Sequence, residues 1–447
     1  MKVLVVGSGA REHALVWRIR QSPQLTGLWV AGGNAGTGQA ATNLAVNPED
    51  IDAVAAAARS LKADLVVVGP EVPLALGLVD LLTRQGVAAF GPTQAAAQLE
   101  ASKGFALEIM REAGVPCPDF QVFNHEADAL SFLEKHRGPL VVKADGLAAG
   151  KGVSLCQTPQ ESAAAVMACM TDELFGPAGK TVVLEEMLTG PEVSVFAFCD
   201  GENLSPLVAA CDYKRLGDGG QGPNTGGMGS FAPPDLWSAD LSEEINRTIM
   251  VPVVRAMAHR GAPYKGVLYA GIMLTPDGPK VLEFNCRLGD PETQVVLPAL
   301  DSDPLDLFMA CCQGGLADKE VVWNTRSHVG VVMVSGGYPG HYATAFEIAG
   351  LDEELPDTMI FHAGTKTVAG TKTDGETGQG RRVLTNGGRV LTVVGTGDSL
   401  AQARSRAYDR VRRISFQGAY HRSDIGDLSA LETGESTWTP RPAAPAG

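Results

Sequence analysis

Residues 281–292 read Val-Leu-Glu-Phe-Asn-Cys-Arg-Leu-Gly-Asp-Pro-Glu, and this stretch is the most informative one for the fold. Its apolar start predicts a strand, on which Glu283 and Asn285 lie two residues apart and therefore face the same side. A carboxylate and an amide oxygen suit Mg²⁺, which takes few protein ligands and completes its shell with water and phosphate oxygens. Arg287 falls on the same face if the strand continues, where it could clamp a transferring phosphoryl group. An edge strand with polar residues facing solvent remains an alternative.

The residues before this stretch predict its partner strand. A second apolar run covers 267–274, and Pro276-Asp277-Gly278 supplies a hairpin turn between the two strands. A long helical pattern, 242–261, precedes the hairpin. Further upstream, the polar, glycine-rich stretch 217–230 shows no periodicity, which is typical of a functional or disordered segment.

A glycine-rich loop lies in the middle of the chain. Residues 141–153 read Val-Val-Lys-Ala-Asp-Gly-Leu-Ala-Ala-Gly-Lys-Gly-Val, which lacks the spacing of a Walker A loop. Lys143, at the end of a buried strand, could neutralise phosphate charge as a point cation. The glycines would let the backbone approach phosphate oxygens closely. A flexible surface loop with solvated lysines is the alternative.

An acidic segment follows another predicted strand. Residues 182–192 read Val-Val-Leu-Glu-Glu-Met-Leu-Thr-Gly-Pro-Glu. The carboxylates could accept hydrogen bonds from an adenine amino group and from ribose hydroxyls. Taken alone, a charged strand end in solvent explains the segment better.

The first hundred residues alternate strands with helices, which predicts a parallel sheet covered on both faces. The first turn, Gly7-Ser8-Gly9-Ala10-Arg11-Glu12, has only two of the three glycines of a dinucleotide fingerprint, and no acidic residue ends the second strand. The turn therefore argues against a NAD-dependent dehydrogenase. It is either a simple tight turn or a site for a small anion at a helix N-terminus.

Composition limits the possible classes of protein. The 447 residues are 45% hydrophobic and 19% charged, which is the balance of a globular protein. A net charge of −15 argues against nucleic-acid binding, which needs a basic face. The eight cysteines form no C-x-x-C pair, and no apolar run of about 18 residues could span a bilayer. A reduced, cytoplasmic protein with no membrane partner is expected.

Taken together and in this order, these motifs resemble the ATP-grasp superfamily and, within it, the glycinamide ribonucleotide synthetase family. The resemblance covers residues 1 to about 426. It rests on segments 7–14, 33–37, 69–71, 99–103, 143–153, 222–229, 283–294 and 422–426. The two most specific are Glu-Phe-Asn-Cys-Arg-Leu-Gly-Asp-Pro-Glu-Thr-Gln at 283–294 and Arg-Ser-Asp-Ile-Gly at 422–426.

The resemblance implies an α/β and α+β multidomain fold. A Rossmann-like domain with a parallel sheet is expected at 1–101, followed by an ATP-grasp domain of two subdomains at 102–326. Residues from about 122 to 189 would form a lid that closes over ATP. A small C-terminal mixed β domain is expected at 327–426 and a disordered tail at 427–447.

The resemblance also implies the reaction. The family joins glycine to 5-phosphoribosylamine with ATP, through a glycyl phosphate, in purine biosynthesis. A carboxylate is a poor electrophile, so ATP first phosphorylates it, and positioning with charge neutralisation carries most of the rate. The implied partners are these small molecules, the implied cofactor is Mg²⁺ or Mn²⁺, and a monomer is expected. A catalytically dead ATP binder is disfavoured because every phosphate and metal position is filled.

Site residues follow from the resemblance, position by position. Catalytic roles are implied for Arg287, Lys143 and Asp212, and metal binding for Glu283 and Asn285. ATP binding is implied for Lys103, Lys143, Gly150, Lys151, Gly152, Glu185, Glu186, Leu188, Glu192, Arg215 and Asn224. Contacts to the other substrates are implied for Gly9, Arg11, Gly69, Pro70, Glu71, Lys214 and Asp290.

The sequence departs from the family pattern at three places. Ala10 stands where a third glycine is usual, and Tyr213 stands where the family has histidine. The strand before Glu283 offers Tyr269-Ala270-Gly271 instead of an acidic metal ligand. Another carboxylate–amine ligase or a carboxylase of the same superfamily is the remaining alternative.

Overall fold

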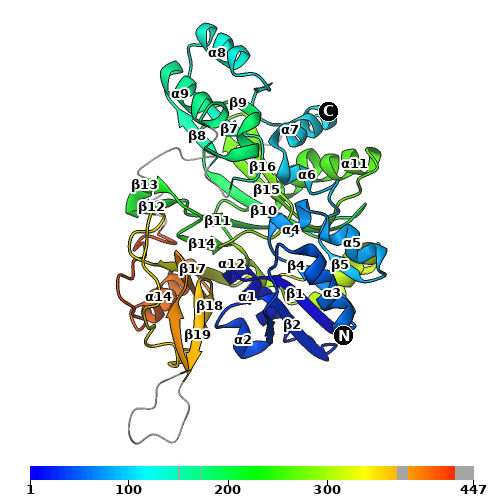
Figure 1. Cartoon of the computed structure of the whole chain (residues 1–447), viewed down its shortest axis with the longest axis vertical. Helices are drawn as coiled ribbons and strands as arrows, with labels where there is room; N and C mark the ends of the chain where they lie inside the picture. Colours follow the sequence, from blue (N-terminus) through cyan, green and yellow to red (C-terminus); the bar gives the residue numbers. More distant parts are fainter. Residues whose placement is uncertain (149–151, 173, 370–380, 428–447) are drawn as a thin grey trace, which may run out of the picture.

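The computed structural model describes residues 1–148, 152–172, 174–369 and 381–427. A parallel sheet forms the N-terminal region, and a long antiparallel sheet runs through the middle of the molecule (Figure 1). A separate four-stranded sheet stands out at one end. This arrangement confirms the expected fold class. The residues expected to form the disordered tail lie outside the described part, apart from Asp427.

The N-terminal sheet has the strand order β3-β2-β1-β4-β5, and all its pairs are parallel. Leu4 and Val6 of β1 face the layer of α3 and α5, while Val3 and Val5 face the layer of α1 and α13. The elements are β1 (Lys2–Gly7), α1 (Ala10–Ile19), β2 (Gly27–Gly32), α2 (Thr37–Ala40), β3 (Thr42–Leu44), α3 (Ile51–Leu61), β4 (Leu65–Val68), α4 (Glu71–Ala75), α5 (Leu78–Arg84) and β5 (Ala88–Phe90).

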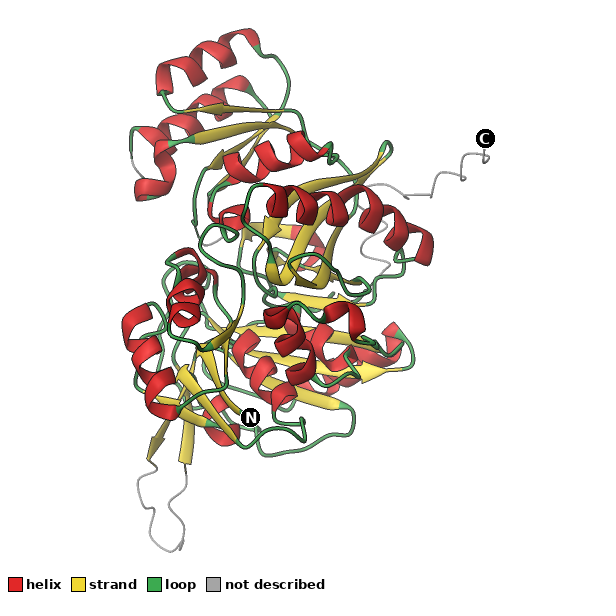
Figure 2. Ribbon diagram, turned by 90° about the vertical axis from the view of Figure 1, so that its right-hand side faces the viewer, coloured by secondary structure: helices red, strands yellow, loops and turns green. Residues whose placement is uncertain are grey.

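The four-stranded sheet has the order β6-β9-β7-β8 and is antiparallel throughout. Helices α8 and α9 cover one of its faces (Figure 2), and Leu133, Val142 and Val166 belong to one buried apolar cluster. The elements of this part are α6 (Gln98–Ala101), α7 (Lys103–Ala113), β6 (Phe120–Phe123), α8 (Glu126–Lys135), β7 (Leu140–Ala144), β8 (Val153–Cys156), α9 (Pro159–Met170), the 3-10 helix η1 (Gly176–Lys180) and β9 (Val182–Glu186).

The long antiparallel sheet has the order β16-β15-β10-β11-β14-β17-β21-β18. Strand β14 pairs with β17, so the sheet continues across position 326, where we expected a domain boundary. Its first part contains β10 (Glu192–Asp200), β11 (Val208–Asp212), β12 (Arg215–Gly217), η2 (Asp218–Gly220), β13 (Gln221–Asn224), β14 (Gly229–Ala232), α10 (Ala239–Ile245), the π-helix η3 (Asn246–Met250), α11 (Val251–His259), β15 (Lys265–Thr275) and β16 (Gly278–Asn285).

The C-terminal part adds a second small ribbon, β19-β20, beside the long sheet. Its elements are α12 (Thr293–Val296), η4 (Leu297–Ala299), α13 (Pro304–Gln313), η5 (Leu316–Asp318), β17 (Ser327–Val334), β18 (Thr358–His362), β19 (Thr365–Ala369), β20 (Arg381–Thr385), β21 (Arg389–Gly397) and α14 (Leu400–Val411).

The stretch 217–230 is more ordered than its sequence indicated. It contains β13, which pairs with β12 as a two-stranded ribbon, and the first two residues of β14. All four residues of β13 are exposed. A strand without a buried face has no apolar alternation, so its sequence carries no strand signal.

Helix α1 is covered by segments far along the chain. The buried Arg18 guanidinium donates hydrogen bonds to the carbonyl oxygens of Leu300, Asp301 and Ser302. His13 packs edge-on against Phe361, and its Nδ1 accepts a hydrogen bond from the backbone N–H of His362 at 2.8 Å. The N-terminal region is therefore held against both the middle and the C-terminal parts of the chain.

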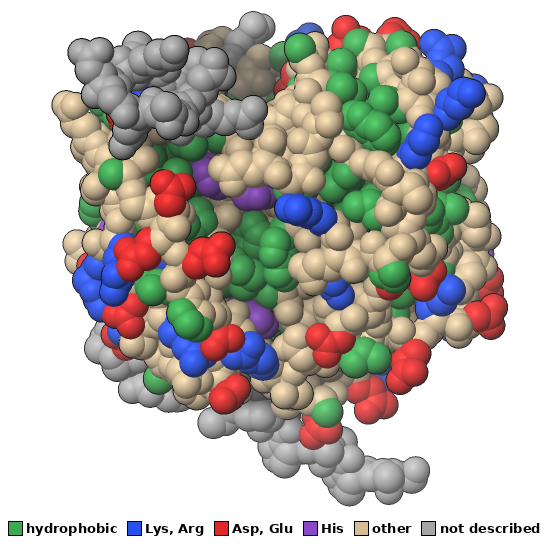
Figure 3. Space-filling model, turned by 90° about the horizontal axis from the view of Figure 1, so that it is seen from below, with side chains coloured by type: hydrophobic (Ala, Val, Ile, Leu, Met, Phe, Trp, Pro, Cys, Tyr) green, Lys and Arg blue, Asp and Glu red, His purple; other side chains and the backbone are tan. Residues whose placement is uncertain are grey.

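The surface and the cysteines can be compared with the composition. Acidic and basic side chains are interspersed on the face seen in Figure 3, which bears no broad basic patch. All eight cysteines are free thiols. Within the described ranges, no helix combines the length and the apolar character that crossing a membrane would require.

Candidate active site

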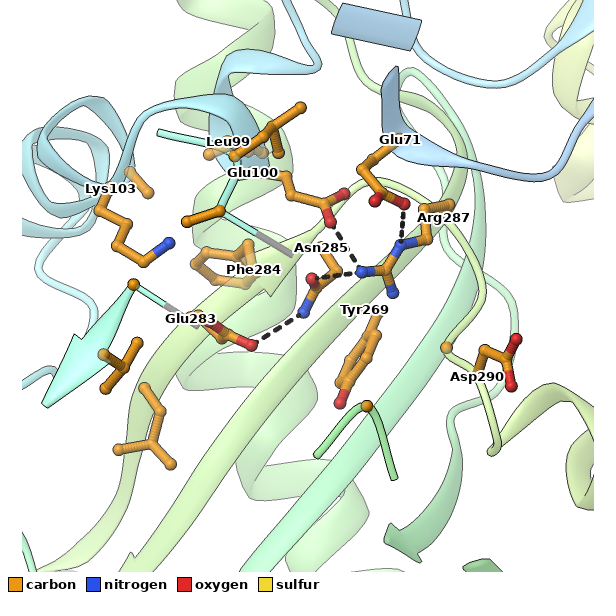
Figure 4. Close-up of a pocket in the computed structure, with 18 of the residues that line it drawn as sticks. Glu71, Leu99, Glu100, Lys103, Tyr269, Glu283, Phe284, Asn285, Arg287 and Asp290 are labelled. Atoms are coloured by element: carbon orange, nitrogen blue, oxygen red, sulfur yellow. Dashed lines mark hydrogen bonds and ion pairs between the residues drawn. The ribbon is translucent and has the colours of Figure 1, made fainter. Parts of the chain in front are cut away.

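A cavity of about 350 Å³ lies where the four-stranded sheet, the long sheet and the N-terminal region meet. Figure 4 shows part of its lining, which comes from α4, α6, α7, β15, β16 and the turn after β16. Among the residues predicted from the sequence, it is lined by Arg11, Glu71, Lys103, Gly152, Glu185, Asp212, Lys214, Glu283, Asn285, Arg287 and Asp290. These residues span almost 280 positions of the chain, yet they border one cavity.

Strand β16 presents Glu283 and Asn285 on the same side, as their spacing predicted, and ends at Asn285. The Asn285 Nδ2 group lies 3.4 Å from Glu283 Oε1. The pairing of β16 with β15 shifts register here, because Ile272 pairs with Val281 while Gly271 pairs with Glu283. Leu282 is thus the extra residue of a bulge, and its carbonyl oxygen accepts a hydrogen bond from Lys143 Nζ at 2.9 Å.

Three lysines from separate elements set the charge around Glu283. Burial alone would raise the pKa of this carboxyl, but the ammonium groups of Lys103, Lys143 and Lys214 outweigh burial and hold the pKa below its usual value. Glu283 is therefore an anion surrounded by cations. The lysines next to this carboxylate are the groups that could contact the phosphates of a nucleotide.

Lys143, on β7, is not among the residues that line the cavity, and only 5% of its surface is exposed. Its ammonium group forms an ion pair with Glu185 at 2.7 Å, in addition to the hydrogen bond to Leu282. An ammonium group has three N–H donors. Two of them have these partners, so contact with a phosphate oxygen would use the third.

Arg287 is held by acidic and amide side chains. Its Nη2 donates to Glu100 Oε1 at 2.8 Å and to Asn285 Oδ1 at 3.0 Å, while its Nε donates to Glu71 Oε2 at 3.3 Å (Figure 4). Burial alone would lower the pKa of this guanidinium, but the carboxylates of Glu100 and Glu71 raise it well above its usual value. Arg287 is thus a permanent cation at the edge of the cavity.

A second polar network lies at the start of β10 and the end of β11. Lys214 Nζ forms ion pairs with Glu192 Oε1 at 2.6 Å and with Asp212 Oδ1 at 2.8 Å. Nearby, Tyr269 donates a hydrogen bond to Glu292 Oε1 at 2.9 Å. Burial, and next the charge of Asp212, raise the pKa of Glu292 to about 7, although Lys214 opposes this shift. Glu292 therefore changes its charge near neutral pH.

The raised pKa of Glu292 predicts a pH-dependent stability. An unfolded glutamate ionises near pH 4.3, so the folded protein is penalised increasingly between about pH 4.5 and 7 and carries the full penalty above pH 7. We expect the Glu292→Gln variant to gain thermal stability over the wild type at pH 8 and little at pH 5. The shift is worth on the order of 3–4 kcal/mol. Thermal melts at both pH values measure it, with Glu320→Gln at an exposed position as the control. An equal gain at both pH values would contradict the assignment.

The first glycine turn surrounds a side chain of the protein itself. Glu12 Oε2 accepts a hydrogen bond from the backbone N–H of Gly9 at 2.6 Å, and Glu12 Oε1 accepts one from Arg11 Nε at 2.7 Å. A Cβ at Gly69 would lie 2.2 Å from Glu12 Oε1, and a Cβ at Gly9 would lie 2.8 Å from Glu12 Oε2. The helix N-terminus thus already holds a carboxylate of the chain itself, which favours the tight turn over the small-anion site. Both glycines make room for Glu12.

Several predicted residues lie away from the main cavity. Glu186 is exposed and forms an ion pair with Lys280 at 3.3 Å. Arg215 and Asn224 lie opposite each other on the β12–β13 ribbon, and Asn224 borders a second cavity. Gly9, Gly69, Pro70, Leu188 and Glu192 are also absent from the lining of the main cavity. Gly150 and Lys151 lie outside the described residues.

The structure adds lining residues that the sequence analysis did not assign: Glu100, Tyr269, Glu292 and Arg389. The first three lie in segments named in the sequence analysis, so they could have been predicted from their positions in or next to the motifs. Arg389 had no such signal, because it begins an ordinary strand far along the chain. It forms an ion pair with Asp290 at 3.3 Å and donates to the carbonyl oxygen of Gly226, and so connects the C-terminal region to the site.

The two substitutions relative to the family pattern are accommodated structurally. Tyr213 is buried against Phe231 and Arg422, and its hydroxyl accepts a hydrogen bond from the backbone N–H of Gly426 at 3.0 Å. It is absent from the cavity lining, so it stabilises the C-terminal region instead of facing the site. Ala10 is the buried first residue of α1.

The donor set at β16 fits a divalent cation that is shared with phosphates. In the described part of the chain, no three His, Cys, Asp or Glu residues form a metal-binding cluster. A carboxylate with one amide oxygen is a donor set that suits a Mg²⁺ ion bound mainly through water and phosphate oxygens. Tyr269 and Gly271, which pair with Asn285 and Glu283, supply no further carboxylate.

The fold and the site together define an ATP-grasp protein, in which a small antiparallel sheet and a larger one enclose a cavity lined by lysines and by a carboxylate–amide pair. Comparison with protein families identifies the branch. Models of the N, ATP-grasp and C domains of phosphoribosylglycinamide synthetase match residues 1–100, 101–293 and 328–428. The chain belongs to the phosphoribosylglycinamide synthetase family.

Relatives match over nearly the whole chain. A phosphoribosylamine–glycine ligase of Salmonella typhi is 44% identical over 430 residues, which are 95% of this chain and 98% of the relative. One of Rhodopirellula baltica is 46% identical over 438 residues, with 96% and 98% covered. The crystal structure of a phosphoribosylamine–glycine ligase from Thermotoga maritima has a TM-score of 0.80 at 33% identity, covering 95% of this chain and all of that one. A biotin carboxylase domain of Hydrogenobacter thermophilus, at 15% identity and TM-score 0.70, shares the fold.

Proposed function

We propose that the chain is a phosphoribosylamine–glycine ligase. It joins glycine to 5-phosphoribosylamine through a glycyl phosphate and releases N1-(5-phosphoribosyl)glycinamide, ADP and phosphate, a reaction of purine biosynthesis. The observation that carries the proposal is the convergence of Lys103, Glu283, Asn285 and Arg287 with Arg11 and Glu71 on one cavity. The proposed nucleotide-binding residues and residues of the N-terminal region thus line the same cavity. The full-length relatives support the same reaction.

We assign the ATP-binding residues in three groups. Lys103 and Lys143 bind phosphate oxygens, together with the glycine loop that includes Gly152. Glu185, with the backbone of Glu186 and Leu188, accepts hydrogen bonds from adenine, and Glu192 binds the ribose. Arg215 and Asn224, on the exposed ribbon, would reach the phosphates only when the surrounding parts close together.

The metal ion is assigned to Glu283 and Asn285, and we expect Mg²⁺, with Mn²⁺ as a substitute. The ion would neutralise charge on the phosphates during phosphoryl transfer. The Asn285 oxygen accepts a hydrogen bond from Arg287, and its amide nitrogen lies near Glu283. The amide oxygen, which has two lone pairs, is the atom that would bind the metal ion.

Arg287 stabilises the negative charge that develops on the transferred phosphoryl group, since its guanidinium is a permanent planar donor. Asp212 is ion-paired with Lys214 and lines the same cavity, where we assign its carboxylate to accept the proton that the attacking amine loses. Arg11, Glu71 and Asp290, with the turns at Gly9 and at Gly69-Pro70, are assigned to phosphoribosylamine. Lys214, which also lines the cavity, is assigned to the substrates other than ATP.

We further propose that residues from about 122 to 189 act as a lid. These residues form the separate four-stranded sheet with α8 and α9, and they carry Lys143 and Glu185. Closure would exclude water from the acyl phosphate, which water would otherwise hydrolyse. We also propose domain boundaries after residues 101, 326 and 426.

The test is ADP release with Mg-ATP and glycine, with and without freshly generated phosphoribosylamine. We expect ADP only when both substrates are present. ATP binding without ADP release under these conditions would show that the acceptor is wrong. Release that depends instead on bicarbonate would favour a carboxylase of the same superfamily.

A further inference from the structure

Glu100 is a buried carboxylate beside the proposed active site. It lies in the short helix α6, three residues before Lys103, and is 8% exposed. Its Oε1 accepts a hydrogen bond from Arg287 Nη2 at 2.8 Å. Its Oε2 accepts two hydrogen bonds from Cys286, one from the backbone N–H at 2.8 Å and one from the thiol at 2.9 Å. Both oxygens are therefore engaged by the two residues that follow strand β16.

These contacts fix the part of the chain that has no strand partners. Strand β16 ends at Asn285, so the ladder with β15 no longer holds the backbone at Cys286 and Arg287. The bond from Glu100 to the Cys286 N–H takes the place of a ladder bond, and the bond to Nη2 orients the guanidinium. One carboxylate thereby fixes both the backbone next to Arg287 and the Arg287 guanidinium group.

The other partners of Arg287 hold it less firmly. Glu71 lies 3.3 Å from Nε, and 27% of its side chain is exposed. Asn285 accepts a bond at 3.0 Å through a neutral amide oxygen. The bond from Glu100 is shorter than either and is both charged and buried, and charge-assisted hydrogen bonds are roughly twice as strong as neutral ones.

We propose that Glu100 is a positioning residue that holds the Arg287 guanidinium, and the backbone at Cys286, in the orientation needed for phosphoryl transfer. The proposal rests on the ligase function proposed above. Glu100 does not act on the substrate itself, because one of its oxygens is turned toward Arg287 (Figure 4) and the other toward Cys286. Removing it should therefore lower kcat while leaving the KM for ATP nearly unchanged, since ATP is held by other residues.

The experiment compares Glu100→Gln with Glu112→Gln, a matched change at an exposed position of α7. In Glu100→Gln the amide nitrogen must face either the Cys286 N–H or the guanidinium, and both are donors, so one contact is lost. We expect kcat to fall about 10- to 100-fold. The KM for ATP should stay within about threefold, and Glu112→Gln should behave as the wild type.

A double variant distinguishes positioning from general destabilisation. If Glu100 acts through Arg287, then Glu100→Gln should cost little further kcat in an Arg287→Lys background, because Lys cannot be oriented as a planar fork. Full additivity of the two losses would overturn the proposal, as would a kcat of Glu100→Gln within threefold of the wild type. Should Glu100→Gln fail to fold, Glu100→Asp keeps the charge but shortens the reach, and wild-type kcat in that variant would equally overturn it. A wild-type chain that releases no ADP would instead refute the ligase function.

Discussion

In the Glu283→Ala variant, we expect Mg²⁺-dependent ADP release to fall by at least about 10³-fold, with the folded structure retained. Glu283 is the anionic member of the proposed metal site, and its pKa lies below the usual value because three ammonium groups surround it. Alanine removes the charged ligand and leaves only the neutral Asn285. Phosphates could still be attracted by the lysines, but the charge that develops during their transfer would be less well compensated.

The measurement is ADP release at a series of Mg²⁺ and Mn²⁺ concentrations, with thermal melts of the same samples. Glu243→Ala, on the exposed side of α10, is the control. A variant that unfolds would show that Glu283 mainly stabilises its strand. Activity restored fully by a few millimolar more metal would show that Glu283 contributes affinity alone.

The Lys143→Ala variant should lose at least about 10²-fold in kcat/KM, which is the usual effect of removing one charge-stabilising donor. Lys143 is the cation on β7, and it contacts both Glu185 and the carbonyl oxygen of Leu282 on β16. It therefore also connects the proposed lid with the strand of the proposed metal site. Activity within about threefold of the wild type would exclude the phosphate-binding role.

Loss of Lys143 also leaves Glu185 as a buried, unpaired charge, which can itself destabilise the protein. The double variant Lys143→Ala, Glu185→Gln removes that charge. If activity stays low in the double variant, the ammonium group acts on the substrate. If activity returns, the loss in the single variant came from the unpaired carboxylate of Glu185. Lys135→Ala, an exposed change on α8, is the control.

The strand pattern allowed much of the fold and part of the site to be predicted. The spacing of Glu283 and Asn285 gives their common face directly, because side chains alternate along a strand. The parallel N-terminal sheet follows in the same way from alternating strands and helices. Strands β3 and β13 were missed because they are short and exposed, and such strands have no apolar alternation.

Contacts between distant segments could not be predicted from the pattern. Glu100 and Arg287 are 187 positions apart, and neither residue alone indicates the other. The sequence left the first glycine turn open as a tight turn or a small-anion site, and the structure places Glu12 there, with its side chain folded back toward Gly9. Arg389 reaches Asp290 only because the long sheet continues from the ATP-grasp region into the C-terminal region.

The cover over helix α1 has a consequence for how the protein is made. The carbonyl groups that Arg18 contacts lie 282 to 284 positions later in the chain, and the partner of His13 lies 349 positions later. These contacts can form only after the later segments have been synthesised. At ribosomal speeds of about 5–20 residues per second, the first of these delays lasts roughly 15 to 60 s. During that interval the N-terminal sheet can form, but the outer side of α1 is still uncovered. A chaperone that binds apolar helix surfaces would therefore meet this segment early in synthesis and release it only when most of the chain has emerged.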